Sequence, residues 1–276
     1  MRLAVIVTTY EWPEALRLCL EGLRRQTDLA FELIVADDGS GPATTELIRS
    51  FAATAPFAVR HVWQEDKGYR AAAIRNRAIA ASDADYLLFT DGDSIPLPGW
   101  VAMHRGLACP GWMIAGGRAL TRPDFAQALL AGARAVPAGS AWSWFGARLA
   151  GGIDRWLPML SLPGVAWRKL KPRDWRRART GNLSLWRSDI LRVNGFDESF
   201  EGWGHEDADL AARLVHGGVR CLIARFGVPV VHLWHPAFDR GVEREHWRWI
   251  EELAASQRTQ PRRGLREAAA DAVRTA

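Results

Sequence analysis

Cysteine is scarce in this sequence, with three residues in a chain of 276. Cys19, Cys109 and Cys221 lie far apart, and none belongs to a CxxC pair. The odd number and the wide spacing exclude a disulfide framework and argue against a cysteine-ligated zinc site. We therefore expect a protein of a reducing compartment.

Long apolar runs are also missing, because no stretch approaches the ~20 apolar residues that a membrane-spanning helix needs. The apolar run at residues 3–7 is too short for the core of a signal peptide and instead predicts a first buried strand. We expect a cytoplasmic protein, either free or peripheral at the inner face of the membrane.

Acidic residues are nearly missing from one short stretch. Residues 168–179 hold seven basic side chains and a single acid, Asp174. Because the whole chain carries a net charge of +5, the remainder is close to neutral. A local basic patch differs from the broad basic face of a nucleic-acid-binding protein, so we expect no nucleic-acid partner. The composition, 48% hydrophobic and 24% charged, is that of a globular protein.

The first 117 residues alternate strand and helix signals. Helical spacing follows Pro13 and covers residues 71–81, and apolar runs predict strands at residues 3–9, 31–36, 59–63, 86–90 and 113–117. This alternation predicts an α/β fold with a mostly parallel central sheet flanked by helices. Ligands of such sheets bind outside the carboxyl ends of the strands.

The second half of the chain is less regular. Residues 120–179 allow no assignment. Beyond them we expect a strand at residues 180–186, helices at 189–194 and 206–216, strands at 219–225 and 228–233, and a helical tail from Val242.

Two acidic clusters follow predicted strands. Asp91 and Asp93 flank Gly92, so both carboxylates can reach one hard cation. Mg²⁺ or Mn²⁺ held in this way can also bind diphosphate oxygens. Asp38 can accept hydrogen bonds from a nucleobase or ribose, although Asp-Gly-Ser is also a good turn.

The segment Gly202 to Asp207, Gly-Trp-Gly-His-Glu-Asp, is the most informative. Trp203 offers an apolar plate for a sugar face, and Glu206 and Asp207 can bind hydroxyl groups. Asp207 lies near a predicted helix N-terminus, which favours its ionised form, and an ionised carboxylate beside a hydroxyl can act as a general base. The competing interpretation is a buried Trp followed by acids that stabilise the first helical turn.

Two histidines frame the sequence His-Leu-Trp-His. His232 follows a predicted strand and can complete a metal site with Asp91 and Asp93. His235 is the weaker candidate. A lone histidine of this kind is more often structural, and that alternative stays open.

Taken together, these motifs resemble those of family 2 glycosyltransferases, which have the A-type nucleotide-sugar-binding fold. The similar stretches are residues 5–10, 33–40, 68–70, 75–76, 86–93, 180–182, 195–198 and 202–207. The C-terminal half is similar to the galactosyltransferase-like branch, which includes chondroitin polymerases. The resemblance implies a single nucleotide-sugar transferase domain, with a donor-binding half at 1–117, an acceptor-binding and catalytic half at 118–241, and a helical tail at 242–276.

The resemblance also implies donor-binding roles. Thr8, Tyr10 and Asp38 would hold the nucleoside, with Arg75 and Asn76 near the nucleotide.

The other implied roles concern the metal and the acceptor. Asp93 and His232 would be metal ligands, and Asp91 would bind the ribose or the metal. The acceptor would contact Trp203, Gly204 and Glu206, and Asp207 would be the catalytic base.

The implied activity is that of an inverting, metal-dependent glycosyltransferase of the hexosyltransferase type, in polysaccharide biosynthesis. It would move a sugar from a nucleotide-diphosphate donor to a hydroxyl of a glycan or lipid-linked acceptor. A UDP-sugar is the favoured donor, and Mn²⁺ or Mg²⁺ would be the cofactor. The alternative is a non-catalytic nucleotide-sugar- or glycan-binding protein, which predicts a broken DxD motif or a missing base. A dinucleotide oxidoreductase lacks support, because no GxGxxG turn follows the first predicted strand.

Six tryptophans lie between residues 142 and 186, around the basic stretch. Trp together with Lys and Arg is typical of contact with a membrane interface and anionic headgroups. The alternative is an acceptor-side subdomain with Trp in its core and a solvated basic loop, and both remain open. The membrane hypothesis assigns the contact to Trp167, Lys169, Lys171, Arg173, Trp175, Arg176 and Arg177.

Overall fold

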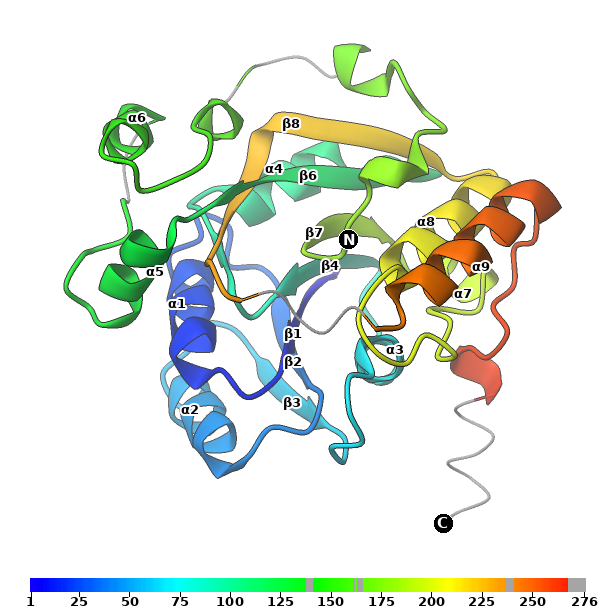
Figure 1. Ribbon diagram of the computed structural model, residues 1–276, viewed down its shortest axis with the longest axis horizontal. Coiled ribbons are helices and arrows are strands. Elements are labelled where there is room, and N and C mark those ends of the chain that lie inside the picture. The colour runs from blue at the N-terminus through cyan, green and yellow to red at the C-terminus, as the bar shows by residue number, and fades with distance from the viewer. Residues whose placement is uncertain (138–140, 161, 163–165, 237–240, 268–276) are drawn as a thin grey trace.

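A single mixed sheet forms the centre of the computed structural model, which describes residues 1–137, 141–160, 162, 166–236 and 241–267. Its strand order is β3-β2-β1-β4-β7-β6-β8-β5, with helices on both faces (Figure 1). The strands are β1 (Leu3–Thr9), β2 (Glu32–Asp37), β3 (Val59–Trp63), β4 (Tyr86–Asp91), β5 (Ser94–Pro96), β6 (Trp112–Leu120), β7 (Asn182–Trp186) and β8 (Arg220–His232).

The helices follow the strands in a βα pattern in the first half of the chain. They are α1 (Pro13–Arg24), α2 (Pro42–Ala52), α3 (Ala71–Ala80), α4 (Trp100–Leu107), α5 (Pro123–Leu130), α6 (Ala141–Leu149), α7 (Arg187–Arg192), α8 (Glu206–His216) and α9 (Glu243–Ser256). Three short 3₁₀ helices, η1 (Leu157–Met159), η2 (Ala166–Lys169) and η3 (Trp175–Arg177), lie between α6 and β7.

The sheet is mostly parallel, which confirms the predicted α/β fold. Strands β3, β2, β1 and β4 pair in parallel, and so do β6 and β8. Strand β7 is antiparallel to both of its neighbours, and β5 is antiparallel to β8. The carboxyl ends of β1, β2 and β4 therefore meet at one edge of the sheet, as the βαβ pattern predicts.

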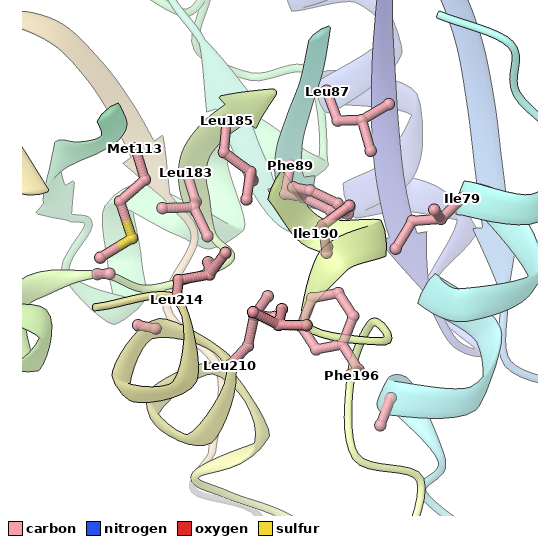
Figure 2. Close-up of a cluster of buried hydrophobic side chains, with 14 of the residues drawn as sticks. Ile79, Leu87, Phe89, Met113, Leu183, Leu185, Ile190, Phe196, Leu210 and Leu214 are labelled. Carbon is pink, nitrogen blue, oxygen red and sulfur yellow. The ribbon is translucent and has the colours of Figure 1, made fainter. Parts of the chain in front are cut away.

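Alternating side chains of the central strands enter two different cores. In β1, Ala4 and Ile6 face the helices α3 and α8, whereas Leu3, Val5 and Val7 face α1 and α4. Burial on both sides explains why this strand is apolar at nearly every position. Figure 2 shows the first of these cores, where Phe89 of β4 and Leu183 of β7 meet Phe196 and Leu210.

The end of the sheet differs from the expectation in one respect. We expected strands at residues 219–225 and 228–233, but the structure has the single strand β8. Its pairing with β6 shifts between Gly116 and Gly117, so residues 225–228 have no partner in the β6 register. A bulge of this kind bends a strand without ending it, and β8 is sharply bent in Figure 1.

The unassigned middle of the chain builds a third core around Trp144, which is 1% exposed. It packs with Leu18 of α1, Phe125 of α5 and Ile153. Among the helices that the structure describes, none is long and apolar enough to cross a membrane.

One residue of the predicted membrane contact is buried, so the prediction is wrong at that residue. Trp175 is 8% exposed and belongs to the core beneath α8, so it cannot enter a membrane. Arg168 is also buried and donates hydrogen bonds to the carbonyl groups of Leu162 and Phe226. The side chain of Trp167 lies outside the described residues.

Candidate active site

The predicted donor-binding residues of β1, β2 and β4 lie side by side at the carboxyl edge of the sheet. The amide of Asp38 donates to the carbonyl of Thr9 at 3.0 Å, and the amide of Gly92 donates to the carbonyl of Thr8 at 2.7 Å. These backbone bonds extend the parallel pairing past the strand ends. They place Thr8, Asp38 and Asp91 around one surface.

Arg75 of α3 joins this surface to the acceptor segment. Its guanidinium group donates to Thr8 Oγ1 at 3.0 Å and to Glu206 Oε1 at 2.8 Å, and lies 3.3 Å from Asp91 Oδ1. Burial alone would lower the pKa of Arg75, but the carboxylates of Glu206 and Asp91 raise it above its ordinary value. Arg75 is therefore a fixed positive charge between two predicted substrate sites.

Asp38 and Tyr10 lie on the predicted donor side, the first buried and the second exposed. Burial raises the pKa of Asp38, although its carboxylate accepts hydrogen bonds from the Arg70 amide at 2.7 Å and from the Gln64 side chain. The Tyr10 ring is 47% exposed, and its hydroxyl donates to Asp66 at 3.0 Å. An exposed ring beside a buried carboxylate suits a nucleobase, which has an apolar face and polar edges.

Asn76, which was predicted to lie near the nucleotide donor, instead contacts Phe196 and Glu198. Its amide nitrogen donates to the Phe196 carbonyl and to Glu198 Oε1, and its oxygen accepts from the Phe196 amide. These bonds lie between 2.8 and 3.0 Å and tie α3 to the turn that precedes α8. In this structure the amide of Asn76 is engaged with that turn.

A candidate metal site lies beside Asp91. Carboxylate and imidazole atoms of Asp93, His232 and His235 lie within 4.8 Å of one another. His232 Nδ1 is 3.0 Å from Asp93 Oδ1, and His235 Nε2 is 3.4 Å from Asp93 Oδ2. The antiparallel pairing of Ser94 with His232 brings the two chain segments together.

The charged groups of this cluster shift one another's pKa values toward the ionised forms. Burial alone would raise the pKa of Asp93, but His232 and His235 lower it below its ordinary value. Burial would likewise lower the pKa of His232, but Asp93 raises it. One carboxylate and two imidazoles form a donor set that fits a divalent transition metal, Mn²⁺ included, better than Mg²⁺, which prefers oxygen ligands alone.

The grouping differs from the predicted ligand set. His235, the weaker sequence candidate, contacts Asp93, whereas Asp91 is absent from the described cluster and pairs with Arg75. Gly181 packs against this second carboxylate, because a Cβ at position 181 would lie 2.7 Å from Asp91 Oδ2. The His-x-x-His spacing was the sequence signal for His235.

The acceptor segment is held by its backbone. Gly202 has φ +84°, and a Cβ there would lie 2.7 Å from a methyl group of Val242. Its amide donates to the Tyr69 carbonyl at 2.9 Å, and His246 of α9 donates to the Gly204 carbonyl at 2.9 Å. Trp203 is half-buried between these two anchors.

Glu206 and Asp207 begin α8 and differ in their partners. Glu206 is 6% exposed and is paired with Arg75. Asp207 Oδ2 lies 3.7 Å from Arg179 Nε, beyond hydrogen-bond length. Burial raises the pKa of Asp207 to about 6, although Arg179 opposes the rise. Asp207 is therefore the better-placed proton acceptor, because the carboxylate of Glu206 is held in a close pair with Arg75.

Two protein-family models match this chain. The model of glycosyl transferase family 2 matches residues 4–119, and that of the N-terminal domain of galactosyltransferase matches residues 164–235. Residues 4–119 therefore form a glycosyltransferase family 2 domain. The two matched ranges hold all of the predicted site residues.

Two curated relatives are similar to this chain over most of its length. Validoxylamine A glucosyltransferase of Streptomyces hygroscopicus subsp. jinggangensis is 31% identical over 245 residues, 83% of this chain and 56% of that protein. Chondroitin synthase of Escherichia coli is 27% identical over 237 residues, 78% of this chain and 32% of that protein. The chain thus spans about half of the first relative and a third of the second.

Solved structures of glycosyltransferases share the fold. S. aureus TarS 1–349 in complex with UDP has a TM-score of 0.62 at 16% identity, over 93% of this chain and 65% of that chain. The mannosyltransferase PcManGT from Pyrobaculum calidifontis, in complex with GDP-Man and Mn²⁺, has a TM-score of 0.56 at 20% identity, over 99% of this chain and 64% of that chain.

Proposed function

We propose that this chain is an inverting, metal-dependent glycosyltransferase that moves a sugar from a nucleotide-diphosphate donor, a UDP-sugar for preference, to a hydroxyl of a glycan or lipid-linked acceptor. The family 2 domain and the named activities of the two relatives support the reaction class. The complexes of TarS with UDP-GlcNAc and of PcManGT with GDP-Man support a nucleotide-sugar donor.

The observation that carries the proposal is the buried Arg75 link. One guanidinium group contacts Thr8 and Asp91 on the donor side and Glu206 on the acceptor side. Asp207, the proposed base, is the next residue. A donor at the strand ends and an acceptor at Gly202–Asp207 would therefore lie on opposite sides of one side chain.

The donor would be held by its nucleoside and its diphosphate. Tyr10 and Asp38 offer an exposed ring and a carboxylate for the base, and Thr8 and Asp91 lie beside Arg75. Asp93, His232 and His235 would hold Mn²⁺, which when bound offsets the charge of a diphosphate.

The acceptor would meet Trp203 and Glu206 before reaction. Asp207 then takes the proton of the acceptor hydroxyl, and the oxygen forms a bond to the anomeric carbon from the face opposite the diphosphate. The bond from the anomeric carbon to the diphosphate oxygen breaks, and the nucleoside diphosphate leaves with the electron pair. Attack from the opposite face inverts the anomeric centre.

Two measurements test this proposal. A screen of UDP- and GDP-sugars with Mn²⁺ is expected to find one donor that is hydrolysed or transferred, and EDTA is expected to abolish the activity. Asp207→Asn should keep donor binding in calorimetry and lose about 10²–10⁴-fold in turnover. Donor binding without turnover in the wild-type protein would favour the non-catalytic alternative.

The metal site has a test that needs no substrate. We expect Mn²⁺ titration followed by electron paramagnetic resonance to show one bound ion in the wild-type protein. Asp93→Ala and His235→Ala should both weaken this binding, whereas Asp91→Asn should weaken it less, because Asp91 pairs with Arg75. If Asp91→Asn weakens Mn²⁺ binding as much as the other variants do, Asp91 is a metal ligand, as the sequence predicts together with Asp93 and His232.

The chain is also proposed to work at a membrane surface. The basic stretch supports this location, but Trp175 of the predicted contact is buried, so other apolar side chains must make the contact.

A further inference from the structure

Helix α6 has two apolar faces. Trp144 and Ala147 lie on one face and are buried in the third core. Trp142, Phe145 and Leu149 recur at positions i, i+3 and i+7 and so lie on another side of the helix. Trp142 is 72% exposed and Leu149 is 73% exposed.

Aromatic contacts extend this second face beyond the helix. The Trp156 ring lies 6.3 Å from that of Trp142 and 5.0 Å from that of Phe145. Leu157, at the start of η1, is 52% exposed. We define the α6 apolar face as Trp142, Phe145, Leu149, Trp156 and Leu157.

Exposed apolar side chains are concentrated in this part of the described chain. Five of the eleven large apolar side chains that are exposed lie between residues 142 and 170. The three most exposed, Leu170, Leu149 and Trp142, are among them. Single exposed apolar side chains are ordinary, whereas a concentration of them marks an interaction surface.

A longer stretch that contains these residues carries the positive charge of the protein. Residues 131–179 contain ten basic side chains and two acids, a net charge of +8, whereas the whole chain carries +5. Both acids are already paired, Asp154 with Arg155 and Asp174 with Arg177. In Figure 1, α6 lies at one edge of the molecule, whereas η3 lies next to α8.

We propose that the α6 apolar face is an interfacial anchor for a bilayer that contains anionic lipids, with Arg148 on the same helix and Lys171, Arg173 and Arg176 farther along the chain as the basic side chains that bind the headgroups. This anchor specifies the peripheral location proposed above and does not depend on the transfer reaction. Indole and leucine side chains enter the boundary between headgroups and acyl chains, and basic side chains bind the anionic headgroups. A second copy of this chain fits the face poorly, because two segments of charge +8 repel each other.

Vesicle sedimentation tests the anchor with the full chain. We expect the protein to pellet with vesicles of about 30% phosphatidylglycerol in phosphatidylcholine, to bind pure phosphatidylcholine much more weakly, and to be released by salt near 1 M. Trp142→Ser combined with Leu149→Ser should weaken binding at least about tenfold, because two apolar side chains no longer leave water. Lys171→Gln combined with Arg173→Gln should weaken it by roughly 25-fold, about fivefold for each charge.

Matched controls separate the anchor from general effects of surface and charge. Leu29→Ser removes an apolar side chain that is 39% exposed in another part of the surface, and should bind like the wild type. Arg49→Gln combined with Arg77→Gln removes the same charge outside the segment, and should also bind nearly like the wild type. Trp142→Phe should keep the binding and reduce the quenching of Trp fluorescence by brominated lipids.

Two results would overturn the anchor. One is a wild-type protein that stays in the supernatant with anionic vesicles at low salt while remaining folded by circular dichroism. The other is self-association in solution that Trp142→Ser with Leu149→Ser abolishes, which would assign the face to a second copy. Because donor turnover is measured separately, loss of vesicle binding and loss of activity stay distinguishable.

Discussion

At the scale of single residues, the pKa of Asp207 predicts the pH dependence of the reaction. Its carboxylate must be ionised to take a proton, and burial raises its pKa to about 6. We expect kcat/KM to fall about tenfold for each pH unit below this value, as one essential proton is bound. The measurement is a pH profile of kcat/KM with saturating Mn²⁺.

The neighbours of Asp207 give that profile a control. Arg179 lowers the pKa of Asp207, whereas Glu206 raises it. Arg179→Gln should therefore move the acidic limb to higher pH while the maximal rate changes less. If the acidic limb of the Arg179→Gln profile lies at the same pH as in the wild type, a group other than Asp207 titrates there.

Arg75 predicts a large effect on stability. Its side chain is 4% exposed and neutralises Glu206 and Asp91. Arg75→Met would leave these two carboxylates without their buried cation, which costs about 3–5 kcal/mol in comparable buried pairs. Urea unfolding measures this loss. The control is Arg49→Met. The Arg49 side chain is 77% exposed and pairs with Glu46, so its loss should change the free energy of unfolding by less than about 1 kcal/mol.

The site residues show what a sequence can predict at this scale. Asp93 and His232 were expected to meet, and they do, because each follows a strand that was identified from its apolar run. The contact of His235 with the same carboxylate depends on how the chain bends after β8, which no local pattern contains. The bridging role of Arg75 likewise joins residues 131 positions apart.

At the scale of elements, Asn76 connects α3 to the turn that leads into α8. Asn76→Ala would leave the buried amide and carbonyl of Phe196 without their partner. An unsatisfied buried polar group costs about 1–3 kcal/mol, so we expect a loss of about 2–4 kcal/mol in unfolding free energy. The exposed neighbour variant Arg77→Ala should have little effect.

Nucleotide binding distinguishes two roles for Asn76. If its amide only positions α8, the Kd for nucleotide should stay unchanged in Asn76→Ala at a temperature where the variant is folded, while kcat falls. A raised Kd with unchanged kcat would instead place the amide in the donor site, as the family resemblance implies.

The strands were predictable from the sequence where both of their faces are buried. The strands β1 and β4 are apolar at nearly every position because both faces are covered, and such runs are visible in sequence. The segment from α5 to η3 was not predictable, since Trp144 packs with Leu18 and Leu233, which are far away in the chain. For the same reason composition could not separate the buried Trp175 from the exposed Trp142.

At the scale of the whole molecule, the C-terminal segment at residues 262–267 packs against the turn at residues 194–198. Residues 262–267 form six hydrogen bonds with Asn194, Asp197 and Glu198, the turn that Asn76 holds from the other side. Leu265 also packs on Gly195, where a Cβ would lie 2.6 Å from it. This segment lies beyond both ranges that match family models.

Removal of residues 257–276 should therefore act on the active site from a distance. Even at the low end of 0.5–1.5 kcal/mol for each hydrogen bond, the six bonds would contribute about 3 kcal/mol to stability. We expect a lower Tm in calorimetry and a lower kcat, because the turn at residues 194–198 positions the segment that carries Asp207. Asp197→Ala removes the acceptor of the Arg262 and Arg263 amides at full chain length and should give a smaller effect of the same sign. If the shortened chain keeps the Tm and kcat of the full chain, the hydrogen bonds of residues 262–267 are not needed to position the proposed acceptor site.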